Sequence, residues 1–87
     1  MRIKVCKFGG SSVASAEQIK KVIKIITSET DRRIVVVSAP GKRFSADTKV
    51  TDMLIALANC VLEGRSTEDA VAAILERFES IRAELDL

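Results

Sequence analysis

A short run of glycine and serine beside a lysine is the part of this sequence whose residue types best suit chemistry. Residues 7–12 read Lys-Phe-Gly-Gly-Ser-Ser and directly follow an alternating apolar segment. Glycines let the backbone come close to a ligand, and amides at a helix entrance favour an anion such as phosphate. Lys7 can place an ammonium beside that anion, while the amides of Gly9 and Gly10 and the hydroxyl of Ser11 add donors. The run lacks the spacing of the Walker and dinucleotide motifs, so a tight turn with a solvated lysine is the alternative.

A second group of small and polar residues follows the next apolar segment. Ser38 ends that segment, and the chain's one proline, a glycine and a mixed charged run predict a loop over residues 38–49. Ligands of parallel sheets gather at the carboxyl ends of the strands, which puts this loop on the same side as Lys7. Ser38 is either close to a ligand or only the last small residue of its strand. Thr51 either contacts a ligand or helps to cap the helix that follows.

The elements that must position these residues alternate between strand and helix, which predicts the α/β class. The run Ile-Val-Val-Val is β-branched and apolar on both faces, as in a strand inside a parallel sheet. A helix after the first strand is indicated by Ser15 as N-cap with Gln18 three residues later. The order is β-α-β-α-α: strands over residues 2–8 and 34–37, and helices opened by Ser15, spanning residues 50–62, and opened by Ser66.

Composition narrows the class of protein. The 87 residues are 47% hydrophobic and 30% charged, with a net charge of +2 and basic residues scattered among acidic ones. This pattern argues against a disordered tail, and the lack of Tyr and Trp argues against a nucleic-acid surface. Cys6 and Cys60 are far apart and the chain has no histidine, so we expect free thiols and no metal site. No apolar run resembles a signal peptide or a membrane span, which predicts a cytoplasmic protein with no membrane partner.

Two motifs in order carry a family resemblance. Residues 7–13, KFGGSSV, are similar to the KFGG[TS]SV opening of aspartate kinases in the amino-acid kinase superfamily. Residues 36–43, VVSAPGKR, and the helix start at residues 49–54, KVTDML, resemble that family's second conserved region. Two motifs with about the right gap are far more specific than either alone. The resemblance extends over essentially the whole chain, and the last helix is its least diagnostic part.

The resemblance implies a portion of the amino-acid kinase three-layer sandwich with parallel strands. It implies that residues 1–87 form an incomplete N-terminal part of that domain, without a regulatory ACT domain. The activity implied is transfer of the ATP γ-phosphoryl group to the side-chain carboxylate of L-aspartate, with Mg²⁺ ligands outside this chain, in lysine, threonine and methionine biosynthesis. By similarity Lys7 is catalytic and binds ATP together with Gly9, Gly10 and Ser11. Ser38 and Thr51 are placed at the aspartate substrate.

Two strands offer two open edges, which predicts that the chain associates with further protein. We expect a homo-oligomer, because unpaired strand edges and apolar helix stripes favour association. The alternative function, from a different class, is a small non-catalytic module for protein interaction or assembly. A lysine, glycine and serine turn set opposite a second small-residue loop favours the kinase interpretation.

Overall fold

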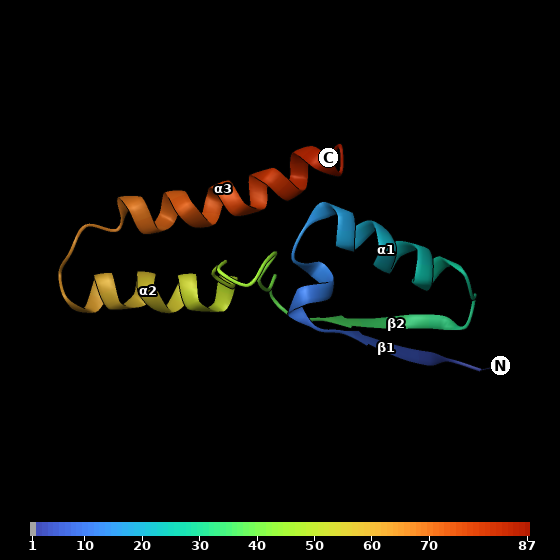
Figure 1. Cartoon of the computed structure of the whole chain (residues 1–87). Coiled ribbons are helices and arrows are strands. Elements are labelled where there is room, and N and C mark those ends of the chain that lie inside the picture. Colours follow the sequence, from blue (N-terminus) through green and yellow to red (C-terminus); the bar gives the residue numbers. More distant parts are fainter. Residues whose placement is uncertain (1) are drawn as a thin grey trace.

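Two parallel strands and a crossover helix form the first half of the chain. The computed structural model describes residues 2–87, in which β1 (Lys4–Phe8) pairs with β2 (Arg32–Val37) and α1 (Ala16–Thr27) joins them. The register puts Lys7 opposite Val36, with an irregularity after Lys4. Helix α1 lies along one face of the sheet, and in residues 2–87 the opposite face carries no helix (Figure 1). The predicted α/β class, element order and parallel pairing are confirmed.

Local sequence explains where α1 begins. Ser15 is its N-cap, in extended conformation, and its hydroxyl accepts a hydrogen bond from the amide of Gln18 at 3.4 Å. This is the predicted cap, which gives a partner to an amide that has none within the helix. The apolar stripe of α1 consists of Ile19, Val22, Ile23 and Ile26. Of these, Val22 is buried, whereas Ile23 is 49% exposed. The stripe therefore only partly covers the small sheet.

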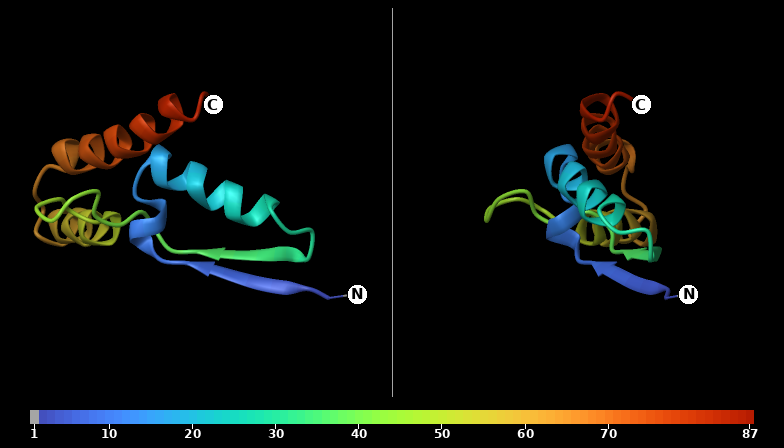
Figure 2. Two further views of the ribbon diagram at one scale, coloured as in Figure 1. Left: turned by 45° about the vertical axis from the view of Figure 1, so that its right-hand side comes forward. Right: turned by 90° about the vertical axis from the view of Figure 1, so that its right-hand side faces the viewer.

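A pair of helices forms the second half of the chain. Helices α2 (Val50–Leu62) and α3 (Glu68–Glu84) run side by side beyond the carboxyl end of the sheet (Figures 1 and 2). Gly64 adopts a φ of 68°, and the amide of Arg65 donates to the carbonyl of Cys60 at 2.9 Å, so α2 ends at a left-handed glycine as predicted. The N-cap of α3 is Thr67, so the prediction of Ser66 was wrong by one residue. The Ser66 hydroxyl instead accepts from the amide of Glu68.

The interior lies at the junction of the two halves and not under the sheet. Its buried residues come from the turn after β1, the loop after β2 and all three α-helices. By contrast, Val5 on β1 is 64% exposed and Val37 on β2 is 57% exposed. The buried set comprises Val13, Ala14, Ala16, Val22, Gly41, Val50, Cys60 and Arg77.

Several expected details need adjustment. Strand β1 begins at Lys4, later than the predicted residue 2. Strand β2 begins at Arg32, earlier than the predicted residue 34. Cys6 and Cys60 are free cysteines, as expected. In the part of the chain that the structure describes, no helix is long and apolar enough to cross a membrane.

Candidate functional site

The carboxyl ends of the two strands lie side by side, as the βαβ arrangement requires. The amide of Ser38 donates a hydrogen bond to the carbonyl of Phe8 at 3.1 Å, extending the pairing by one residue past β2. Lys7, the penultimate residue of β1, and Ser38 are both exposed. Two of the predicted site residues therefore reach solvent at the same end of the sheet.

The residues after β1 form a tight turn that we call the glycine turn (residues 9–12). Gly9 is extended, with φ −74° and ψ 173°, and it precedes the short 3-10 helix η1 (Gly10–Val13). The amide of Ser12 donates to the carbonyl of Gly9 at 3.1 Å, which closes the turn. A Cβ added to Gly9 would meet no atom within 4 Å. The backbone of Gly9 is thus open to the approach of another molecule, and Ser11 beside it is exposed.

The glycine turn packs directly against the loop after β2, which we call the second loop (residues 38–49). The amide of Gly41 donates to the carbonyl of Gly10 at 2.8 Å. A Cβ added to Gly41 would lie 2.7 Å from the carbonyl carbon of Gly10, and one added to Gly10 would lie 3.0 Å from the oxygen of Ala39. Both positions need glycine because backbone meets backbone there. The predicted convergence of the two loops is therefore present as direct contact.

The second loop also sets the start of α2. The amide of Val50 donates to the carbonyl of Pro40 at 2.9 Å, and Val50 itself is buried. Lys49 is the N-cap, without a side-chain capping bond, so Thr51 is the second residue of the helix and not its cap. Thr51 is exposed in the first turn. The hydrogen bond from the preceding residue, Val50, to Pro40 ties the start of α2 to the same loop that contacts the glycine turn.

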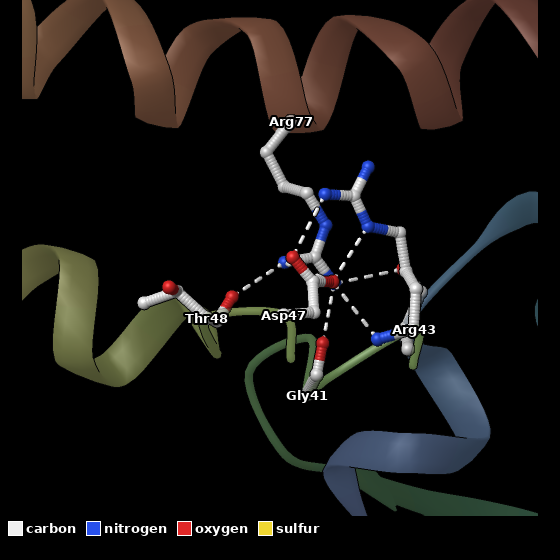
Figure 3. Close-up of polar contacts among 6 residues, drawn as sticks. Gly41, Arg43, Asp47, Thr48 and Arg77 are labelled. Atoms are coloured by element: carbon white, nitrogen blue, oxygen red, sulfur yellow. Dashed lines mark hydrogen bonds and ion pairs between the residues drawn. The ribbon is translucent and has the colours of Figure 1, made fainter. Parts of the chain in front are cut away.

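Arg77, on α3, is a residue of this region that sequence reasoning missed. It is only 4% exposed, and its guanidinium donates to three backbone carbonyls, two of them in the second loop and one just after η1 (Figure 3). Nη1 donates to the oxygen of Thr48 at 3.0 Å, and Nη2 donates to Ala14 at 2.9 Å and to Gly41. Because arginine has five N–H donors in a fixed planar fork, one side chain can serve all three carbonyls.

An ion pair closes the second loop on itself beside Arg77. The carboxylate of Asp47 accepts from Arg43 Nε at 2.7 Å, from Nη2 at 3.0 Å and from the Arg43 amide at 2.9 Å. These hydrogen bonds hold the pKa of the Asp47 carboxyl well below its ordinary value. The same carboxylate lies 3.7 Å from Nη1 of Arg77. Burial lowers the pKa of Arg77, and the charge of Arg43 lowers it further, while Asp47 opposes both effects.

A cavity of about 310 Å³ adjoins this cluster, between the second loop, α2 and α3. None of the six predicted site residues lines it. Residues 2–87 contain no group of three or more His, Cys, Asp or Glu that could hold a metal ion. The cavity lining consists of Arg43, Asp47, Thr48, Met53, Ala73, Glu76, Arg77 and Ser80.

Comparison with known proteins decides the family. The pattern that defines the amino acid kinase family matches residues 2–83. The chain belongs to the amino acid kinase family. It is 52% identical over 85 residues to Aspartokinase 3 of Bacillus subtilis, covering 98% of this chain and 19% of that protein. It is also 37% identical over 83 residues to an aspartokinase of Chlamydia trachomatis, covering 95% of this chain and 17% of that protein.

A solved structure gives the same relationship in three dimensions. The crystal structure of Clostridium acetobutylicum aspartate kinase superimposes with a TM-score of 0.96 at 41% identity. The match covers 100% of this chain and 20% of that one. The predicted relationship to aspartate kinases is therefore confirmed. This member of the amino acid kinase family spans about a fifth of the length of the relatives it matches.

Proposed function

We propose that this amino acid kinase segment supplies part of the ATP and aspartate site of an aspartate kinase. A carboxylate oxygen of L-aspartate attacks the γ-phosphorus of ATP, the new P–O bond forms, and the bond to the β,γ-bridging oxygen breaks to release ADP. Because this chemistry depends chiefly on positioning and on neutralising phosphate charge, a strand-end lysine beside glycine amides is suitable equipment. The supporting observation is the 2.8 Å hydrogen bond that joins the two loops at Gly10 and Gly41.

Each predicted residue has a distinct role in this proposal. Lys7 offsets charge on the phosphates and acts as the catalytic group, and Gly9, Gly10 and Ser11 bind the phosphates through amides and a hydroxyl. Ser38 and Thr51 contact L-aspartate from the second loop side. Mg²⁺ would offset phosphate charge, but residues 2–87 contain no group of three or more His, Cys, Asp or Glu to hold it, so none of these roles depends on it. The setting proposed is cytoplasmic amino-acid biosynthesis.

The test uses a chimera in which this chain replaces the matching segment of Aspartokinase 3 of Bacillus subtilis. We expect the chimera to release ADP in the presence of aspartate and Mg-ATP. Lys7→Ala should lower kcat by about 10²-fold or more, the usual cost of removing one preorganised charge-stabilising group. Lys20→Ala, an exposed lysine on α1, is the matched control and should retain full activity. A folded but inactive chimera, or equal kcat for the two variants, would overturn the proposal.

A further inference from the structure

Arg77 occupies a position where an amphipathic helix would ordinarily present an apolar side chain. It lies on α3 between Ile74 and Ile81, which are half-buried at helical spacing, and it is more buried than either. Burying a guanidinium is costly unless its donors are satisfied. Three backbone carbonyls compensate in part: Thr48 and Gly41 of the second loop and Ala14 after η1 accept from Nη1 and Nη2. Among residues 2–87, no group accepts from the buried Nε.

Each of those carbonyls belongs to a segment that positions part of the proposed site. Ala14 follows the glycine turn, Gly41 lies in the second loop, and Thr48 comes just before α2. Gly41 is also the residue whose amide bonds to Gly10. Nη2 alone donates to both Ala14 and Gly41, so one nitrogen connects the residue that follows η1 with the second loop. Figure 3 shows Arg77 reaching Gly41 from α3.

We infer that Arg77 is a positioning residue, which holds the glycine turn, the second loop and the start of α2 in their relative places for phosphoryl transfer. This inference rests on the proposed function, but it assigns the role to a residue on a different element from any proposed contact. Arg77 acts through backbone carbonyls and does not itself touch substrate. Displacement of reacting groups by about 1 Å can cost 10²-fold in rate, so a modest shift of either loop would be visible in kcat.

Asp47 supplies a negative charge close to the guanidinium of Arg77. Its carboxylate is held by Arg43 and lies 3.7 Å from Arg77, so the charge of the buried guanidinium has a nearby counterion. A lysine at position 77 would keep the positive charge near Asp47. It could not supply planar donors to three carbonyls in different directions. The substitution Arg77→Lys therefore tests the planar donor geometry of the guanidinium separately from its positive charge.

The experiment compares Arg77→Gln and Arg77→Lys with the parent chimera. Arg82→Gln is the control, because Arg82 lies on the same helix and its side chain is 51% exposed. Melting temperatures are measured first, and kinetics are then run well below the lowest of them, with the folded fraction determined for each protein. We expect kcat to fall at least tenfold in both Arg77 variants, with Arg77→Lys recovering more of the melting temperature than of kcat. Arg82→Gln should match the parent.

Two outcomes would overturn the inference. One is a kcat in Arg77→Lys equal to that of the parent, because the fork geometry would then be irrelevant. The other is a loss of activity in Arg77→Gln that merely follows the folded fraction, because Arg77 would then stabilise the fold without positioning the loops. An inactive parent chimera would instead count against the proposed function itself.

Discussion

Replacing Gly41 by alanine should force the glycine turn and the second loop apart. The added Cβ would lie 2.7 Å from the carbonyl carbon of Gly10 and 2.8 Å from the amide nitrogen of Ser11. The closer distance is 0.7 Å inside the 3.4 Å at which ordinary contact begins. Both obstructing atoms belong to the backbone, so no side-chain rotation can relieve the clash. The loops must move, or the 2.8 Å hydrogen bond between Gly41 and Gly10 must break.

The expected cost follows from the size of this overlap. Overpacking of this kind costs about 1–3 kcal/mol, so the melting temperature of the chimera should fall by roughly 2–12 °C. Gly9→Ala is the control for stability. Its Cβ would meet nothing within 4 Å, and its φ of −74° is allowed for alanine. That substitution should leave the melting temperature unchanged or raise it slightly, because it lowers the conformational freedom of the unfolded chain.

Differential scanning fluorimetry of the three proteins gives the comparison, and kcat measured at low temperature gives its functional counterpart. Gly41→Ala should lose activity even where it is fully folded, since the loop contact that aligns the site is disturbed. A Gly41→Ala chimera with the melting temperature and kcat of the parent would show that the loops do not depend on this contact. Equal destabilisation by Gly9→Ala would refute the steric explanation.

Three further predictions concern charge, activity and assembly. Because the folded-state pKa of Asp47 is depressed below 3.8, its contribution to stability is present above that pH and is lost as the pH falls. The melting temperature of the parent chimera should therefore decline more steeply below about pH 5 than that of Asp47→Asn, and parallel declines would contradict this. The 87-residue chain alone should show no aspartate-dependent ADP release in a coupled assay, and turnover that requires Lys7 would contradict that expectation. It should also self-associate as concentration rises in light scattering, whereas a cooperatively melting monomer that binds no apolar dye would argue against association.

The expected association has a clear physical origin. Within the part of the chain that the structure describes, one face of the sheet carries no helix (Figures 1 and 2), and Ile34 on β2 is 49% exposed. On α2, Ile55 is 54% and Leu62 is 83% exposed. Full burial of one such side chain is worth about 1.5–3 kcal/mol, so these surfaces strongly favour contact with further protein. In the chimera, sequence beyond the matched segment is available to supply that contact.

The features that could be predicted from the sequence are those governed by local rules. The hydroxyl of Ser15 caps α1, Gly64 ends α2, and α2 itself spans the predicted residues. The convergence of Lys7 and Ser38 also followed, because parallel strands bring their carboxyl ends together. That Lys7, Ser38 and the other site residues contact ligands stays a prediction, which the variants described above test.

Helix faces were harder to predict, because α2 is apolar on nearly every side. Helical spacing predicts one stripe of Val50, Leu54, Leu57 and Val61. Val50 is buried as expected, but Leu54 and Val61 are 48% and 63% exposed. Cys60, which lies outside that stripe, is buried too. Periodicity cannot choose between faces when all of them are apolar, and the choice depends on where α3 packs.

The burial of Arg77 was the hardest feature to predict from local sequence, because its contacts are with residues 29, 36 and 63 positions away. Of the apolar residues that recur at helical spacing on α3, Ile74 and Ile81 are half-buried, whereas Leu75 and Phe78 are 63% and 44% exposed. An arginine between two isoleucines at helical spacing was the available signal. Its burial follows from the packing of the loops, because the contact between the glycine turn and the second loop encloses backbone carbonyls that need donors. The guanidinium of Arg77 donates to these carbonyls, which a leucine side chain could not do. The buried residues of this chain therefore also hold the loops of the proposed site in place. Substitutions that disturb the interior should consequently lower activity as well as stability.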